Sequence, residues 1–567
     1  MVDNAQLAIF RQSIMPATSP PVSTPSTHRC RLWLSLAAGL AIGLASELAV
    51  GLTSEPASAS SFPAAAAMPL WFVEQRPRVA AYQAVNLLGA AAQEGLEAGD
   101  YNAEWLRAAI ESAGRGSPLT EDSLSRLDQA LTSAMRRYLT DLHAGQVDPQ
   151  ALGARYSPAA TWGFAPDDLL ASAIADGRLV EAVRGVAPAL QQYTGLREAL
   201  ARYRELVSHP AWQKSLPSLP AGKLFPGQKY GGIAALGERL RLLGDLPAGT
   251  ALPVAYEGAL VAGVKSFQER HAIRPDGVIA KDTYEQLDVP PATRVRQLEL
   301  ALERLRWTPL LQAPRAIVVN LPEFMLTAYE LRDGRIQTGV EMKVIVGTAR
   351  KNQTPLFDAE MRFIEFSPYW NVPPSIARGE TLPRLRRDPG YFARQGFEFV
   401  GSDGRVSGGF SEGALEAVQR GQMRIRQRPG AGNALGDIKF VFPNEDNIYL
   451  HHTPSVQLFN RARRDFSHGC IRVEAPVALA KFVLANEAEW TEERIVQAMR
   501  RGKSSTIRLQ EGLPVILAYS TALVRKGRVH FFPDIYGQDR LLDDALRQRS
   551  NALRASHESE IAARLTD

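Results

Sequence analysis

The sequence predicts an α+β protein of several domains, helical in its first half and mostly β in its second. Three observations lead to this prediction. At 567 residues the chain is too long to fold around one hydrophobic core. Apolar residues recur at three- and four-residue steps from about residue 70 to about residue 310, which is the period of helices. After Pro314, short β-branched runs divided by turn residues take over, which is typical of strands.

Composition excludes one class of partner. The chain is 45% hydrophobic and 22% charged, which is ordinary for a folded protein. Its net charge of +5 is only mildly basic, and its Lys and Arg residues form no dense block with interleaved aromatic residues. We therefore expect no nucleic-acid partner.

Residues 1–59 are predicted to be an N-terminal export signal or membrane anchor with a linker. A basic stretch that includes Cys30 precedes an uncharged run over residues 32–45, and an Ala-Ser-Ala sequence follows as a cleavage site. The run could instead continue past Glu47 as a poor membrane anchor. The charged flank lies late for a signal, so translation could start at Met15. In each case we expect the rest of the chain to be exported.

A helical scaffold domain is predicted over residues 70–225. Its clearest helix ends at Gly145 and carries apolar side chains at helical spacing, namely Leu124, Leu127, Leu131, Met135, Tyr138 and Leu142. This pattern predicts core packing and indicates no chemistry.

Residues 226–290 are predicted to form a small three-helix domain. Two motifs stand out, Val-Lys-Ser-Phe-Gln at residues 264–268 and Asp-Gly-Val-Ile-Ala at residues 276–280. They resemble the peptidoglycan-binding domain, with Ala280 in place of its usual glycine. The resemblance implies glycan binding, although a helical core and an ordinary Asp-Gly turn would explain the same residues. A linking helix is expected over residues 291–314.

The β-rich region is predicted to form one domain over residues 315–505. Its first strands are indicated by β-branched runs at residues 317–320, 325–329 and 342–347. A polar insertion rich in Gly and Arg interrupts the domain over about residues 375–422. A C-terminal extension is expected over residues 506–567.

One constellation in this domain points to chemistry. Cys470 ends the sequence Ser-His-Gly-Cys, nineteen positions after His451, and removal of a signal would leave it the only cysteine. A lone thiol near an imidazole suits nucleophilic acyl transfer, in which the thiolate attacks and the imidazole moves protons. A free cysteine is more often a small buried hydrophobe, but its place in a polar turn favours function.

This arrangement resembles the catalytic signature of the L,D-transpeptidase (YkuD) family, a histidine roughly sixteen to twenty residues before Ser-His-Gly-Cys. The resemblance includes the stretch from residue 346 to residue 355. The insertion resembles the substrate-capping insertion of the large YcbB-type subgroup, which also carries a peptidoglycan-binding domain. The blocks on both sides of the insertion match that subgroup as well.

The resemblance implies roles for the residues of the motif. Cys470 is the expected nucleophile and His451 the expected base, with His468 as the rival base. His452 follows His451 on a predicted strand, so its side chain should face the opposite side. Backbone N–H groups of the turn before the nucleophile are expected to stabilise an oxyanion. The residues that shape this turn and pocket are Ser467, His468 and Gly469.

Substrate contacts are also implied. Arg472 could hold a carboxylate of a stem peptide by a bidentate contact, or make an ordinary surface salt bridge. The expected substrate-binding residues are Arg472, Trp370 and Asn371. Arginines are dense around the insertion and the motif, and most are expected on a solvated face: Arg384, Arg386, Arg387, Arg424, Arg426, Arg428, Arg461, Arg463 and Arg464.

A zinc site is the main chemical alternative, and its ligands would be His451, His452, His468 and Cys470. Adjacent strand histidines diverge, and the chain has no Cys-x-x-Cys or His-Glu-x-x-His spacing. We therefore expect no metal and no organic cofactor.

The resemblance implies an exported, periplasmic enzyme that forms 3→3 peptidoglycan cross-links. A cysteine thioester would form on a donor tetrapeptide stem, release D-Ala and pass to an acceptor stem. Three questions stay open. Water could resolve the thioester, which would make an L,D-carboxypeptidase or endopeptidase. The chain could be a non-catalytic peptidoglycan-binding scaffold, and it could be attached to the inner membrane.

Overall fold

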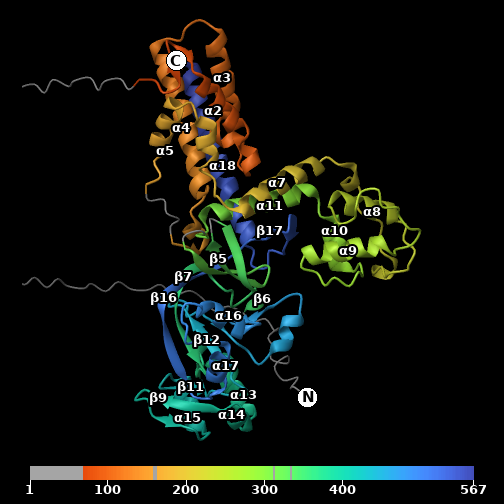
Figure 1. The fold of residues 1–567 in the computed structure, drawn as a ribbon, viewed down its shortest axis with the longest axis vertical. Coiled ribbons are helices and arrows are strands. Elements are labelled where there is room, and N and C mark those ends of the chain that lie inside the picture. The colour runs from red at the N-terminus through yellow and green to blue at the C-terminus, as the bar shows by residue number, and fades with distance from the viewer. Residues whose placement is uncertain (1–67, 158–162, 311–312, 333–334, 567) are drawn as a thin grey trace, which may run out of the picture. The chain divides into compact units, whose positions relative to one another are not determined.

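The computed structural model describes residues 68–157, 163–310, 313–332 and 335–566 (Figure 1). The predicted signal or anchor segment, with Cys30, lies outside these residues. Within the described ranges, no helix is both long enough and apolar enough to cross a membrane.

The first described region is helical, as predicted. Its helices are α2 (Val79–Gly89), α3 (Ala103–Arg115), α4 (Glu121–Ala144), α5 (Pro166–Ala175), α6 (Leu179–Arg184) and α7 (Gln191–Leu206). Short elements join them: β1 (Phe72–Val73), β2 (Arg76–Pro77), η1 (Ala91–Glu94), η2 (Ala98–Tyr101), η3 (Pro149–Leu152), β3 (Ala154–Arg155), η4 (Pro210–Trp212) and η5 (Pro220–Gly222).

Helix α4 confirms the predicted apolar pattern. The side chain of Thr120 caps its first turn by accepting a hydrogen bond from the Ser123 N–H. All six predicted apolar residues of this helix are buried. Gly145 ends the helix with a φ of 87°, which favours glycine.

The next region is a three-helix unit of α8 (Ile233–Leu242), α9 (Ala259–Arg270) and α10 (Lys281–Asp288). The side chain of Gln268 accepts from the Gly277 N–H at 2.8 Å and donates to the Val278 carbonyl at 2.9 Å. Both sequence motifs therefore help to hold this unit together. Glycan binding by this unit stays a prediction. Helix α11 (Pro291–Trp307) follows.

The β-rich region closes into a barrel. Its strands follow the order β12-β13-β15-β6-β5-β4-β16-β7, and β12 also pairs with β7. Their bounds are β4 (Arg315–Asn320), β5 (Met325–Arg332), β6 (Arg335–Gly347), β7 (Leu356–Phe366), β12 (Ile438–Val441), β13 (Leu450–His451), β15 (Ile471–Val473) and β16 (Ser505–Ala518). The barrel core also takes side chains from α16 (Pro476–Val483) and α17 (Glu492–Arg500). Beside it lie η7 (Val456–Asn460) and β14 (Asp465–Ser467).

Two pairings cross the predicted domain bounds. Strand β16 starts at Ser505 and pairs with both β4 and β7, so the sheet continues past residue 505, the predicted end of the domain. Strand β3 follows the helical region in sequence, yet it pairs with β7. Local periodicity carries no information on partners this far away in the chain, which is why these pairings were not predicted.

The insertion folds as a unit with its own core, which we call the cap (residues 370–427). Its sheet has the order β10-β9-β11-β8. The elements are β8 (Trp370–Asn371), α12 (Pro374–Ile376), the π-helical turn η6 (Ala377–Thr381), α13 (Leu382–Arg387), α14 (Gly390–Arg394), β9 (Phe397–Gly401), β10 (Val406–Ser407), α15 (Glu412–Gln419) and β11 (Met423–Gln427). The cap is wider than the predicted 375–422 because its flanking strands β8 and β11 pair with each other.

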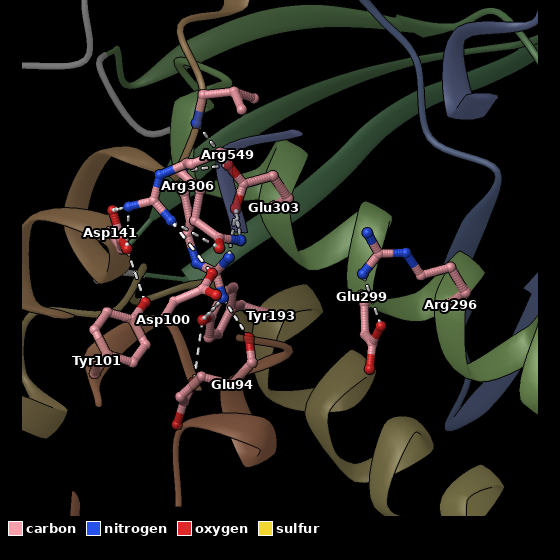
Figure 2. A network of polar contacts seen from close by, with 12 residues as sticks. Glu94, Asp100, Tyr101, Asp141, Tyr193, Arg296, Glu299, Glu303, Arg306 and Arg549 are labelled. Atoms are coloured by element: carbon pink, nitrogen blue, oxygen red, sulfur yellow. Dashed lines mark hydrogen bonds and ion pairs between the residues drawn. The ribbon is translucent and has the colours of Figure 1, made fainter. Parts of the chain in front are cut away.

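The C-terminal extension returns to the helical region. After the hairpin of β17 (Ala522–Arg525) and β18 (Arg528–Phe531), helix α18 (Gln538–Thr566) runs beside α4 and η2 (Figure 1). A polar network holds it there (Figure 2). Arg549 forms a bidentate ion pair with Asp141 at 2.7 and 2.8 Å, and Tyr101 donates to the same carboxylate at 2.7 Å. This extension is therefore a structural part of the helical region.

Candidate active site

Strands β13 and β15 bring the predicted catalytic residues to one face. The two strands run parallel, with Leu450 opposite Ile471 and His451 opposite Arg472. Leu450 and Ile471 are fully buried in the barrel core, so the alternate positions of both strands face outward. The residues that share this outer face are Tyr449, His451, Cys470 and Arg472.

Cys470 is a free, partly exposed thiol on this face. Its S–H donates to the carbonyl oxygen of Asn447, with Sγ and oxygen 3.7 Å apart. Burial raises the pKa of the thiol, while hydrogen bonds from Tyr449 and the nearby cations Lys439 and Arg472 act in the opposite direction. The thiol is therefore protonated at neutral pH and needs a base to become a nucleophile.

His451 is held in the tautomer that a base requires. Its Nδ1 lies 2.6 Å from the carbonyl oxygen of His452. A carbonyl can only accept, so Nδ1 carries the proton and Nε2 keeps a free lone pair. Burial and, next, the cation of Arg472 lower the pKa of His451 to about 3, although the bond to the His452 carbonyl acts in the opposite direction. The imidazole is therefore neutral in the free enzyme.

Hydrogen bonds on the barrel side hold the turn that carries Cys470. Oγ of Ser467 accepts from the Gly469 N–H at 3.2 Å and donates to the Cys470 carbonyl at 2.6 Å. Oγ1 of Thr354 donates to the Gly469 carbonyl at 2.7 Å and accepts from the Gly347 N–H at 2.9 Å. Gly469 has a φ of 114°, a conformation that favours glycine. Ser467 and Gly469 therefore shape the turn itself.

Arg472 brings an unpaired cation to the same face. Among the described residues its guanidinium has no ion-pair partner, and its buried Nε has no hydrogen-bond partner. Burial lowers the pKa of Arg472, which reflects the cost of keeping an uncompensated charge out of water. A carboxylate ligand would relieve this cost by a bidentate contact.

The three histidines near Cys470 have separate partners. His452 lies 3.4 Å from the Asp437 carboxylate, and His468 bonds through Nε2 to Glu380 of the cap at 2.7 Å. His451 bonds to backbone instead. In the described part of the chain, no three His, Cys, Asp or Glu side chains are grouped as metal ligands. His468 thus hydrogen-bonds to the cap. Of these three histidines, His451 is the one that shares the outer face of β13 and β15 with Cys470.

Trp370 and Asn371 lie in the sheet of the cap. They form β8, opposite Gln427 and Arg426 of β11. Trp370 packs against the core of the cap, and Asn371 is exposed. Neither makes a hydrogen bond with the strands of Cys470 among the described residues, and their role in substrate binding stays a prediction.

Several of the arginines noted in the sequence have internal partners. Arg386 pairs with Glu412 at 3.2 Å, and Arg426 pairs with Glu398 at 2.8 Å. Arg464 is buried and donates to backbone carbonyl groups. These contacts give the three side chains structural roles, whereas Nε of Arg472 has no hydrogen-bond partner among the described residues.

Sequence reasoning missed Tyr449 and Lys439. The hydroxyl of Tyr449 hydrogen-bonds to the Cys470 thiol, and burial followed by the charge of Cys470 raises the pKa of Tyr449. Lys439 of β12 lies opposite His451, and its Nζ is 4.3 Å from the ring centroid of Tyr449. The available signal was strand alternation, because Tyr449 and His451 are two residues apart and must share a face.

Two domain families match the sequence of this chain. The sequence profile of the L,D-transpeptidase catalytic domain (YkuD) matches residues 314–516, and that of a scaffold domain matches residues 60–200. A curated Haemophilus influenzae protein, named as a presumed L,D-transpeptidase, is 35% identical over 248 residues, which cover 44% of this chain and 49% of that protein. The chain thus spans about half the length of this relative.

Solved structures match only distantly. An L,D-transpeptidase structure from Xylanimonas cellulosilytica is 16% identical, with 54% of this chain and 100% of that chain covered, at a TM-score of 0.17. Bdellovibrio bacteriovorus Bd1075 is 14% identical, with 41% of this chain and 56% of that chain covered, at a TM-score of 0.16. Matches this weak support no argument. Residues 314–516 are nevertheless similar in sequence to the L,D-transpeptidase (YkuD) catalytic domain.

Proposed function

We propose that this chain joins peptidoglycan stem peptides through a thioester on Cys470. The observation that supports this best is a protonated thiol and a neutral imidazole on one face of two parallel strands. The imidazole of His451 has its Nδ1 proton committed to a carbonyl, so Nε2 is free to act as a base. The family supplies the substrate class, because its members act on peptidoglycan.

In the acylation step, Nε2 of His451 takes the proton of the Cys470 thiol, which turns from Asn447 toward the imidazole. The sulfur attacks the carbonyl carbon between the third stem residue and the terminal D-Ala. The C–N bond then breaks, the proton on Nε2 passes to the leaving amine, and D-Ala departs. Backbone N–H groups of the turn would stabilise the oxyanion, each by about 3 kcal/mol.

Arg472 would select a stem peptide that carries a carboxylate. Its guanidinium is buried and unpaired among the described residues, so a bound carboxylate would remove an electrostatic penalty that the free enzyme bears. Its strand position opposite His451 would place that carboxylate near the reacting bond.

In the second step, a side-chain amine of another stem attacks the thioester carbonyl. The C–S bond breaks, an amide forms, and the proton lost by the amine returns through His451 to the sulfur. The product is a 3→3 cross-link. Water in place of the amine would give an L,D-carboxypeptidase, and the cap is the element that would exclude water.

The substrate also suggests where the enzyme works. Peptidoglycan lies outside the cytoplasmic membrane, so an enzyme of this family acts there. We propose the periplasm as the compartment, with the export signal predicted within residues 1–59 as the route. The three-helix unit of α8, α9 and α10 would hold the enzyme on the wall.

The test uses purified enzyme, tetrapeptide muropeptides and mass spectrometry. We expect free D-Ala and a 3→3 dimer, both absent for Cys470→Ala and both retained for the control His452→Ala. Tripeptide products without a dimer would support the carboxypeptidase. If the parent enzyme gives no product, and a carbapenem forms no covalent adduct on Cys470, the non-catalytic scaffold is the correct interpretation.

A further inference from the structure

A hydrogen bond joins the cap to the turn that carries Cys470. Oε1 of Glu380 lies 2.7 Å from Nε2 of His468, although the two residues are 88 positions apart. The side chains are 38% and 35% exposed, so the pair is neither buried nor fully hydrated. The hydrogen bond from His468 lowers the pKa of Glu380, so the carboxylate is ionised and accepts this bond.

Glu380 sits on a part of the cap that packs on its core. It belongs to η6, a π-helical turn between α12 and α13, and such turns are frequent at functional sites. Its neighbours Ala377 and Thr381 are buried, and Leu382 and Leu385 belong to the core of the cap. The position of the carboxylate therefore follows the position of the cap as a whole.

His468 sits in a hydrogen-bonded turn beside the barrel. Before it, the Ser467 carbonyl accepts from the Thr348 N–H at 3.0 Å. After it, the backbone of Gly469 is held by the side chains of Ser467 and Thr354. Cys470 follows two residues later on the same turn. The hydrogen bond between Glu380 and His468 therefore fixes the position of the cap relative to the Cys470 thiol.

We propose that Glu380 is a positioning residue: by holding His468, it keeps the cap closed over the thioester and directs the acyl group to an amine instead of water. This inference rests on the function proposed above. Other ion pairs of the cap, such as Arg386 with Glu412 and Arg426 with Glu398, lie within the cap and would not affect its closure.

The two steps of the reaction should respond differently to loss of this contact. A small β-lactam needs the thiol, the base and the turn, and it carries no second stem to align. Transfer to an amine needs two stems held together while water is kept out, which is the purpose of a closed cover. Glu380 should therefore affect the fate of the thioester more than its formation.

The experiment compares the full-length parent enzyme with Glu380→Gln and the matched control Glu412→Gln, which removes an exposed carboxylate of the same cap. Three quantities are measured: the rate of β-lactam acylation of Cys470, the ratio of cross-linked to hydrolysed muropeptide, and hydrogen exchange of residues 377–387. For Glu380→Gln we expect the product ratio to fall about threefold to fivefold, the upper part of the range for one half-exposed contact. We expect faster exchange in the cap, and acylation within about twofold of the parent.

His468→Gln should reproduce the lower product ratio, and the double variant should be no worse than either single one, because both remove the same contact. The control should match the parent in all three measurements. An unchanged ratio in an active Glu380→Gln enzyme overturns the inference, and so does an acylation rate that falls as far as the ratio. If the parent enzyme forms neither cross-linked nor hydrolysed muropeptide, the proposed function itself is wrong. That outcome differs from an active enzyme in which Glu380 has no effect, so the two failures can be told apart.

Discussion

Lowering the pH from about 7.5 to about 5 should leave the acylation rate of Cys470 almost unchanged. Burial lowers the pKa of His451 to about 3, and burial raises the pKa of the thiol. At about pH 5 a base with a pKa of 3 is still about 99% neutral. A histidine with the ordinary pKa of about 6.5 would be only about 3% neutral there, so the rate would fall about thirtyfold. A nearly constant rate therefore indicates a pKa of about 3 for His451, and a thirtyfold fall indicates an ordinary pKa of about 6.5.

The assay is the single-turnover rate of β-lactam acylation, followed by intact-protein mass spectrometry across this pH range. His468→Gln serves as the control, because His468 lies two residues from Cys470 and hydrogen-bonds to Glu380 of the cap. Circular dichroism at each pH shows that the fold persists. A rising limb with a midpoint between about pH 6 and pH 7, retained in His468→Gln, would show that His451 has an ordinary pKa and would refute this reasoning.

The same pKa has a consequence for stability. His451 binds a proton in the unfolded chain below about pH 6.5, whereas in the folded protein its pKa is about 3. Stability is therefore full above the unfolded pKa and is lost as the pH falls toward 3, by about 1.4 kcal/mol per pH unit. Urea unfolding of His451→Asn should show a weaker loss between about pH 6 and pH 4 than the parent. Equal slopes would contradict the assignment.

Three further predictions follow from single contacts. Tyr449→Phe removes a hydrogen bond that lowers the pKa of the Cys470 thiol. Alkylation of Cys470 by iodoacetamide should therefore slow about threefold to tenfold at neutral pH, and an unchanged rate would contradict this contact. Arg472→Lys should raise the KM for a tetrapeptide donor about tenfold by loss of a bidentate contact, whereas a donor with amidated carboxylates should show no further loss. Arg549→Met leaves Asp141 buried without its partner and should cost about 3 kcal/mol in the unfolding of the helical region. The exposed control Arg547→Met should cost at most about 0.5 kcal/mol.

Features that depend on one segment could be predicted from the sequence. The apolar spacing predicted helix α4 with its buried residues, and the β-branched runs coincide with β4, β5 and β6. Both follow from the backbone period of a single element, which the residues themselves display. The similarity of residues 314–516 to the L,D-transpeptidase domain is likewise a property of the sequence, so it could be recognised without a structure.

The candidate site could be predicted only in part. The motif indicated Cys470 and His451 as the reacting pair. Spacing alone did not show that β13 and β15 run parallel, nor that the Nδ1 of His451 bonds to the next carbonyl. Tyr449 was missed because a tyrosine on a strand is most often a packing residue, and only its place beside the thiol gives it a chemical role.

The sequence by itself thus indicated the helical and β regions, the candidate pair Cys470 and His451, and the likeness to the L,D-transpeptidase catalytic domain. The tertiary structure alone decided that β16 completes the barrel, that α18 returns to the helical region, and that Glu380 meets His468. Each of these joins segments far apart in the chain. Such contacts depend on how the barrel closes and how the cap packs on it, and the spacing of residues within one segment holds no information about either.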